Sequence, residues 1–391
     1  MNPGALQFQP SAAARRGALL LAAAGGGLLL LAALLAPQRF WANVLLDSYL
    51  LLGLGLGGAF FVALQGITAS RWSVAFRRVP EAMAGILPAA GLALLAILLL
   101  HPSLYPWVGA GAHGEEALTG FKAFWLRLPF FWMRAALYLV LWTALARTLL
   151  RCSRQQDAAP GAPARAAGIR AAALFLVVFG WTFWLASFDW IMSLEPHWYS
   201  TLFGVYHFAG LFQAALAALI LLLVWLRHRS PLRDFVNPEH FHDLGKLLFA
   251  FSTFWMYIWF SQYMLIWYAN IPEETSYFIA RLHGFWEPLF LLNLTLNWGV
   301  PFLVLLPRGI KRSPAALAKV AVVVLLGRWL DLYLMIFPPL LGETPVFGLW
   351  EIGSLLAVCG AFLLLFFRSL RQAPLVPVND PFLSDSLHYH N

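Results

Sequence analysis

Long apolar runs recur along the whole chain, and they constrain the fold more than any other feature of the sequence. Each run is close to the about 20 residues that a helix needs to cross the hydrocarbon core of a bilayer. The sequence therefore predicts an all-α polytopic membrane protein with about ten transmembrane helices in a single integral membrane domain, residues 1–391. The predicted spans lie at about 17–36, 43–67, 82–100, 124–149, 170–188, 200–226, 246–269, 281–306, 314–337 and 346–368.

The composition agrees with a membrane protein and argues against a soluble enzyme. Hydrophobic residues make up 61% of the chain and charged residues only 11%, whereas a soluble domain carries about 25% charged residues. Ten helices of about 20 residues leave roughly 190 residues for loops and tails, so no soluble domain fits. The net charge of +8 is typical of lysine and arginine on cytoplasmic loops, and we predict lipid contacts and no nucleic-acid partner.

The basic residues predict the orientation. Twenty of the 26 lysine and arginine residues fall on one side of a ten-span arrangement, and such residues favour the cytoplasmic side. Both termini are therefore predicted to be cytoplasmic, with short tails at 1–16 and 369–391. The longest cytoplasmic connection is expected at about 150–169, where Ala, Pro, Gly and Arg are frequent.

Ionisable residues within the spans are the candidate functional residues. Charge inside a membrane is expensive, so it usually faces a bundle interior or a water path. The predicted topology places most of these residues toward the extracytoplasmic face, and the i, i+3 spacing of Arg328 and Asp331 allows an ion pair within one helix. The candidates for a proton path or a quinol-proximal site are Asp47, Arg134, Asp189, His207, Glu287, Arg328, Asp331 and Glu351.

Two interpretations of this set remain open. Carboxylates and a histidine that reach into the membrane from one face can conduct protons, or accept them from a hydroquinone during its oxidation. Any single pair can instead be a structural ion pair that ties helices together. Acids are scarce in the inner halves of the spans, so the sequence favours an outward half-path over a complete channel.

The chain offers no ligand set for a metal or a bound haem. Its two cysteines, Cys152 and Cys359, lie far apart and form no C-x-x-C motif, which excludes a thiolate-bound iron–sulfur cluster or an attached c-type haem. His207 and His283 differ in predicted depth by roughly 9 Å, so they are not expected to be axial ligands of one haem. Zinc and nucleophile motifs are absent from the sequence, and no metal site is predicted.

Three segments carry a family resemblance. They are FDWIMSLEPHWYSTLFGVY at 188–206, HDLGKLLFAFSTFWMYIWFSQYMLIWYANIPEET at 242–275 and GRWLDLYLMIFPP at 327–339. They resemble the ActF-type family, the second NrfD/PsrC-like integral membrane subunits of bacterial alternative complex III, a quinol:cytochrome c oxidoreductase. The resemblance covers most of the chain from the second span onward.

The resemblance implies a fold, partners and a location. It implies two four-helix bundles, spans 2–5 and 6–9, flanked by spans 1 and 10, in the bacterial inner (cytoplasmic) membrane. The implied partners are an iron–sulfur protein, multihaem cytochromes c, a homologous NrfD-like subunit and small membrane subunits. Haem and iron–sulfur clusters are then expected on those partners, while a quinone or menaquinone is the cofactor that this chain would contact. The motif loop supplies Asp189, Trp190, Glu195, His197 and Trp198.

The implied function is a subunit without its own redox cofactor in a respiratory oxidoreductase. We expect this subunit to supply a proton path, and we favour that role slightly over direct oxidation of quinol. The competing class is a secondary transporter or proton-coupled carrier, which also uses many spans and buried charges. Carriers usually place their sites near the midplane on broken helices, whereas the Gly and Pro residues here cluster mainly at span ends. A membrane-embedded transferase is less expected because the loops are short.

Overall fold

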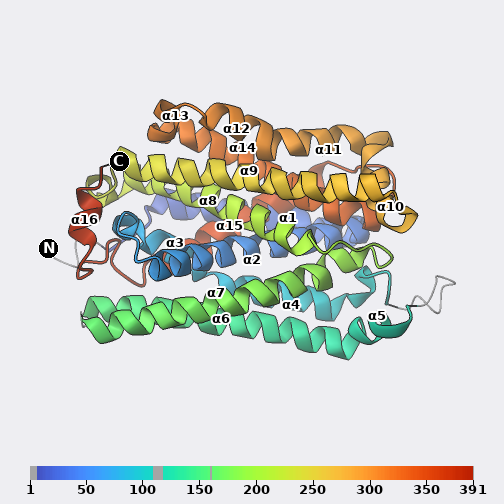
Figure 1. Ribbon diagram of the computed structural model, residues 1–391, viewed down its shortest axis with the longest axis horizontal. Helices are drawn as coiled ribbons and strands as arrows, with labels where there is room; N and C mark the ends of the chain where they lie inside the picture. Colours follow the sequence, from blue (N-terminus) through green and yellow to red (C-terminus); the bar gives the residue numbers. More distant parts are fainter. Residues whose placement is uncertain (1–6, 109–117, 159–160, 391) are drawn as a thin grey trace.

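The structure is a bundle of long helices that run roughly along one direction (Figure 1). The computed structural model describes residues 7–108, 118–158 and 161–390. Within these residues the regular structure is helical, and the only β-type pairing is an isolated bridge between Gln7 and Pro374. Nine helical segments in the described part of the chain are long and apolar enough to cross a membrane. The protein is therefore an all-α polytopic membrane protein, as the sequence predicts.

The long segments follow the predicted spans closely. They are α1 (Ala12–Leu35), α2 (Pro37–Ile67), α3 with α4 (Arg78–Ala84 and Leu87–Leu100), α6 (Leu128–Ala158), α7 (Ala162–Trp190), α8 (Phe203–Arg229), α9 (Pro238–Ala269), α11 with α12 (Glu287–Leu294 and Val300–Leu305), α14 (Pro314–Leu341) and α15 (Leu349–Leu370). Helix α9 has 32 residues, but its tryptophan, tyrosine and polar residues lower its mean hydropathy. It is therefore not among the nine apolar segments, although it lies beside them in the bundle.

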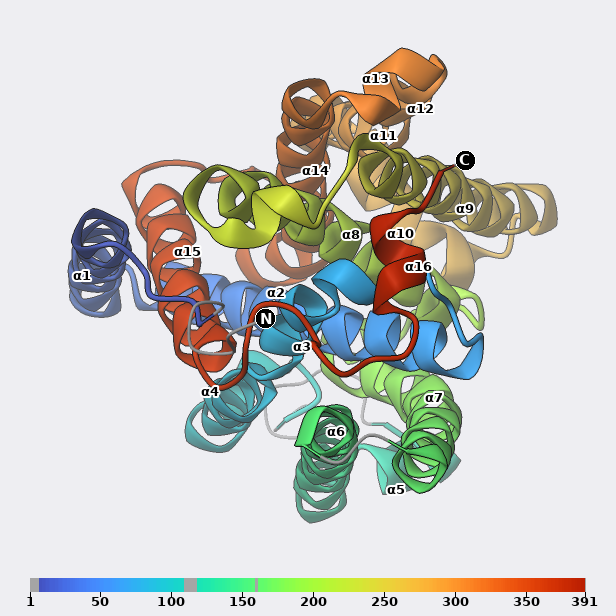
Figure 2. The same ribbon diagram turned by 90° about the vertical axis from the view of Figure 1, so that its left-hand side faces the viewer.

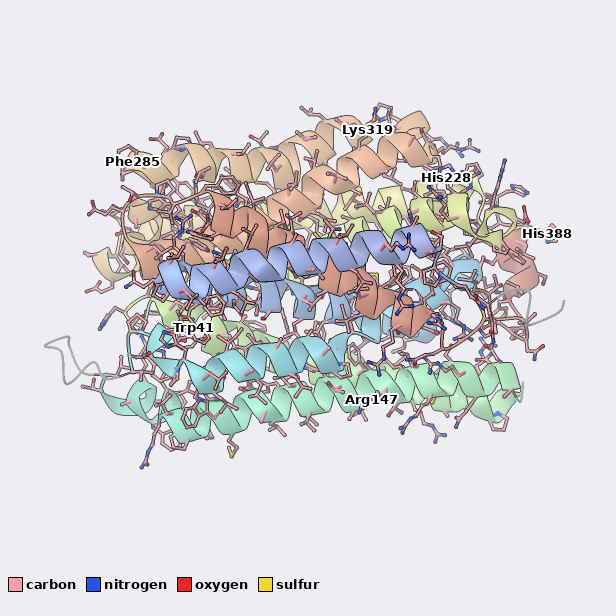
Figure 3. The ribbon with its side chains drawn as sticks, turned by 180° about the vertical axis from the view of Figure 1, so that it is seen from behind. Trp41, Arg147, His228, Phe285, Lys319 and His388 are labelled. Atoms are coloured by element: carbon pink, nitrogen blue, oxygen red, sulfur yellow. The ribbon has the colours of Figure 1, made fainter. Side chains whose placement is uncertain are left out.

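Short elements occupy the two ends of the bundle. They are α5 (Gly120–Trp125), α10 (Pro272–Leu282), α13 (Arg308–Arg312), α16 (Leu383–Leu387), and 3-10 turns at Val74–Phe76, Pro102–Leu104, Met192–Leu194, Pro231–Asp234 and Gly284–Trp286. Helices α13 and α16 lie at one end, which we call the α16 end, and α5 and α10 lie at the other, the α10 end (Figure 1). His228 and His388 lie near the α16 end, and Trp41 and Phe285 near the α10 end (Figure 3).

The helices form two groups with a flanking pair, as Figure 2 shows in an end-on view. The first group contains α2, α3 with α4, α6 and α7, and the second contains α8, α9, α11 with α12, and α14. Helix α2 packs against α8 and α14 and joins the groups, while α1 lies along α15. At Gly25 and Gly360 the α1 and α15 backbones are so close that a Cβ atom would collide with the opposite helix. Small residues allow this approach without a hydrophobic driving force.

Several helix ends differ from the predicted span ends. Helix α6 continues to Ala158 and α7 begins at Ala162, so most of the expected connection at 150–169 is helical. Alanine, arginine and glutamine there have high helix propensity, which extends the helices beyond their apolar parts. The third span is divided between α3 and α4 at Gly85 and Ile86.

The C-terminal segment lies across the α16 end and contacts both helix groups. Asp380 accepts a hydrogen bond from Arg77 at 2.7 Å, and Tyr389 donates one to the Asp243 carboxylate on α9 at 2.6 Å. Burial and this hydrogen bond raise the pKa of Tyr389 to about 12. The segment therefore ties the end of the first group to that of the second.

Candidate functional site

Four arginines in the half of the bundle nearer α10, which we call the α10 half, each have a carboxylate partner; three of them are buried and the fourth, Arg39, is partly exposed. One pair, Arg328 with Asp331, lies within α14, and the others join different segments. Pairing of this kind offsets the cost of placing charge in a membrane interior. The four pairs are Arg39–Glu351, Arg134–Asp189, Arg281–Glu195 and Arg328–Asp331.

The Arg134–Asp189 pair is satisfied on every side. The guanidinium group donates two hydrogen bonds to the Asp189 carboxylate, at 2.9 and 2.8 Å, and a third to the Trp125 carbonyl oxygen at 2.8 Å. It also lies 4.1 Å from the centroid of the Trp125 ring. Asp189 accepts a further bond from the Trp125 indole at 2.7 Å and one from Tyr138 at 3.3 Å. This site ties α5, α6 and α7 together and leaves no polar group free for chemistry.

The Arg328–Asp331 pair is the centre of a second polar cluster, the Asp331 network. Arg328 donates to Asp331 at 2.5 Å, which confirms the ion pair that the i, i+3 spacing allows. Tyr206 on α8 and Asn293 on α11 also donate to Asp331, the latter at 3.1 Å. The network therefore fixes α14 against the two helices on either side of it.

From Asn293 the hydrogen bonds continue toward the middle of the bundle. Asn297 donates to the Asn293 side chain at 2.7 Å, and Gln213 donates to the Asn297 carbonyl oxygen at 2.6 Å. Gln213 also lies 3.0 Å from the Ser252 hydroxyl on α9. Asn297 belongs to a π-helical turn, Thr295–Gly299, between α11 and α12. Such turns are frequent at functional sites because they interrupt the regular backbone pattern.

His207 adjoins this network and has one unoccupied ring nitrogen. Its Nδ1 lies 3.0 Å from the Tyr49 hydroxyl, whereas its Nε2 has no hydrogen-bond partner among the described residues. Tyr206 of the Asp331 network lies next to His207, with 6.2 Å between the two ring centroids. Arg328 fits beside α8 because residue 210 is glycine, where a Cβ atom would collide with the guanidinium group.

A third set of polar side chains, the Asp47 path, runs along α2 and α15 from the α10 end. Arg39, whose side chain is 25% exposed, donates to Glu351 at 3.0 Å. Asn43 donates to the same carboxylate at 3.1 Å, and Ser354 donates to the Asn43 amide oxygen at 3.2 Å. Ser354 lies beside Asp47, which is about 15 Å along α2 from its first residue at about 1.5 Å per residue.

Asp47 differs from the other buried acids of the α10 half. Asp189, Asp331 and Glu351 each pair with an arginine, but no ion pair involves Asp47 within the described part of the chain. Both of its carboxylate oxygens are buried without a hydrogen-bond partner of normal geometry. A buried anion without a counter-ion is expensive, whereas the neutral acid is not. The position therefore suits a group that holds and releases a proton.

The opposite half of the central helices is apolar. In α2, α8 and α14 the segments nearer the α16 end contain only aliphatic, aromatic and glycine residues, at 54–63, 214–226 and 320–327. Polar groups reappear at the α16 end itself, where Arg78 on α3 binds Glu81 and Asp157. Sequence reasoning overlooked Glu81, which lies just before the predicted third span. The hydrogen-bonded chains thus stop near the middle of the bundle.

Glu287 does not belong to the site, although the sequence placed it with the other buried acids. It is exposed as the first residue of α11. An acid there is favoured by the positive end of the helix dipole. The predicted span began at 281, but the intervening residues form the end of α10 and a 3-10 turn. Glu287 therefore lies at the end of the membrane segment.

The motif loop packs against α10 through Glu195 and Trp198. Trp190 and Trp198 are buried, while His197 is exposed. Trp198 stacks on Tyr277 with 4.2 Å between ring centroids, and its indole donates to the Glu274 carbonyl oxygen at 2.9 Å. The ion pair between Glu195 and Arg281 adds to this contact.

Sequence reasoning missed the neutral polar residues that connect the charged ones. The signal was present as i, i+3 and i, i+4 spacing, which places side chains on one face of a helix. Asn43 lies four residues before Asp47, Ser354 lies three after Glu351, and Asn293 lies four before Asn297. A search for charged residues alone passes over them.

The fold and the polar clusters define the class: a multi-pass helical membrane protein whose buried ionisable residues form networks in the α10 half and a second set at the α16 end. No group of three or more potential metal ligands occurs among the residues that the structure describes. No protein-family profile matches the chain, and no curated protein matches it.

Proposed function

We propose that the chain is a membrane subunit of a respiratory quinol:periplasmic-acceptor oxidoreductase of the alternative complex III type, and that it supplies a proton path from the middle of the membrane to the α10 end. The observation that carries the proposal is Asp47, an unpaired buried carboxyl group at the inner end of a polar path. The three sequence segments that resemble NrfD/PsrC-like subunits support the choice of complex.

The charge distribution supports an orientation for this path. Most lysine and arginine residues belong to the α16 end, and such residues favour the cytoplasm. With the α16 end and both termini in the cytoplasm, the α10 end faces the extracytoplasmic side of a bacterial inner membrane. The Asp47 path then opens outward.

The chemistry requires a route of this kind. Oxidation of a quinol releases two electrons and two protons, and the protons need acceptors that return to their original state after each turnover. Asp47 would accept a proton, and Ser354 and intervening water would pass it to Glu351, while Asn43 and Arg39 hold these groups in place. The electrons would pass to haem and iron–sulfur groups on partner subunits. The apolar segments toward the α16 end favour a half-path over a continuous proton wire.

A proton-coupled carrier is the second candidate, and one observation favours it. The segment from α11 to α12 is interrupted by the π-helical turn Thr295–Gly299, beside the Asn293–Asn297 hydrogen bond. Interrupted helices near the midplane are typical of transporter binding sites. The Asp331 network would then hold a polar substrate.

Mild detergent extraction of the tagged chain from its native membrane separates the two candidates. The proposal expects co-purification of subunits that contain c-type haem, with quinol-dependent reduction of that haem. A colourless protein without partners, from membranes whose haem proteins are intact, would refute the oxidoreductase assignment and favour a carrier.

A further inference from the structure

A groove near the α16 end is lined by four arginines and lies between α4, α6 and α15. Arg147, Arg151 and Arg154 follow one face of α6 at i, i+4 and i+7, and Arg368 approaches from α15. The groove encloses a cavity of about 370 Å³. Figure 3 shows Arg147 on the side of the bundle where α1, α4 and α15 lie in front.

These arginines have no acidic partner among the described residues. Within the described part of the chain, Arg154 donates a hydrogen bond to the Gln372 side chain at 3.1 Å. By contrast, Arg77 and Arg78 at the same end bind Asp380, Glu81 and Asp157. The groove therefore carries an uncompensated positive charge.

Buried polar atoms at the groove also lack partners. The Nε atom of Arg154 and the hydroxyl of Ser369 are both shielded from solvent without a hydrogen bond to the described protein. Both residues line the cavity, and Ser369 is only 6% exposed. The guanidinium groups of Arg147, Arg151 and Arg368 belong to exposed residues and are accessible to an anionic ligand with several oxygen atoms.

An apolar slot continues from the basic cavity along α4 and α6. The two share Pro88, Thr143 and Arg147, and the slot encloses about 330 Å³. Its walls away from the arginines are aliphatic: Gly91, Leu92, Leu95, Ala136, Leu139 and Val140. A charged pocket at a helix end that leads into an apolar slot matches the shape of a membrane lipid.

We propose that this groove binds an anionic diacyl phospholipid. Its phosphate would lie among the four arginines, and one acyl chain would follow the slot between α4 and α6. Charge complementarity selects this occupant, because basic pockets between transmembrane helices recognise anionic headgroups. A zwitterionic lipid offers no net charge, and a free phosphate ester does not fill the slot. This inference is independent of the proposed oxidoreductase function.

Native mass spectrometry of the purified, delipidated chain in detergent tests the headgroup site. The added probes are dioleoyl phosphatidylglycerol, dioleoyl phosphatidylcholine and glycerol phosphate. We expect selective binding of phosphatidylglycerol, and a loss of affinity on the order of 30-fold in the double variant Arg151→Gln with Arg368→Gln. The matched control, Arg229→Gln with Arg233→Gln, removes the same charge from exposed positions at the same end and should bind normally.

A second variant tests the slot. Ala136→Phe places a ring in the apolar slot, away from the arginines. It should weaken binding of dioleoyl phosphatidylglycerol and spare the dihexanoyl form, whose short chains do not reach it. If the arginine double variant does not fold, Arg368→Gln alone should lower affinity by about fivefold. The proposal would be overturned if the two dioleoyl lipids bound equally, or if the control pair lost as much affinity as the arginine double variant. It would also be overturned if glycerol phosphate bound as strongly as the lipid, or if Ala136→Phe left binding unchanged.

Discussion

Replacing Asp331 by asparagine is expected to destabilise the protein strongly. The side chains of Arg328 and Asp331 are only 3% and 1% exposed. Asparagine keeps the volume but removes the counter-ion of a buried arginine. Removal of one member of a buried pair typically costs about 3–5 kcal/mol. That corresponds to a change of more than about 100-fold in the folding equilibrium.

Comparison with a double variant separates the ion pair from other effects of the substitution. The double variant Arg328→Gln with Asp331→Asn leaves no unpaired charge, so it should lose less stability than Asp331→Asn alone. The control is Asp385→Asn, the same substitution in the exposed Arg71–Asp385 pair, whose side chains are 62% and 41% exposed. There the loss should not exceed about 1 kcal/mol.

Unfolding of the purified protein in an SDS titration, followed by tryptophan fluorescence, measures these differences. We expect the largest loss of stability for Asp331→Asn, a smaller one for the double variant and the smallest for Asp385→Asn. A double variant that is at least as unstable as Asp331→Asn would refute the pairing energy. Equal losses for Asp331→Asn and Asp385→Asn would refute the role of burial.

Three further predictions concern topology, packing and the tail. Tyr199 is 55% exposed at the α10 end. A cysteine in its place, in a protein without native cysteines, should react with an impermeant thiol reagent added outside intact cells. Labelling only after lysis would contradict the orientation. Gly210→Leu should displace Arg328 and lower the free energy of unfolding by about 1–3 kcal/mol through overpacking. An SDS unfolding curve like that of the unmodified protein would contradict this. Deletion of residues 371–391 should cost about 2 kcal/mol or more by removing the hydrogen bonds to α9 and the first group, and an unchanged thermal midpoint would show that the tail contributes nothing.

The number and placement of the spans could be predicted from sequence because a bilayer requires long apolar helices. The Arg328–Asp331 pair was also predictable, since both residues lie on one helix and helical spacing fixes their separation. Ion pairs between residues on different helices could not be predicted in this way. Arg39 and Glu351 are 312 positions apart, and a single sequence does not specify how two helices rotate toward each other.

The composition of the site was only partly predictable for a related reason. Asp189 and Arg134 were both candidates, but the sequence did not pair them. Asn43 and Ser354 were missed because neutral polar residues are common in membrane helices and carry no charge to attract notice. Glu287 was assigned to the outer part of the eighth span because hydropathy does not resolve where a short turn ends and the helix begins.

The variant Asp47→Asn in the purified native complex tests the proposal that Asp47 carries protons released by quinol oxidation. Asparagine retains the shape of the side chain, but its amide group does not accept and release a proton as a carboxyl group does. Quinol:acceptor turnover and haem content are measured together, with Asp385→Asn as a control acid at the α16 end. Turnover in Asp47→Asn should fall by about 100-fold or more at normal haem content, while the control remains active. Normal turnover in Asp47→Asn with normal haem content would contradict the proposal.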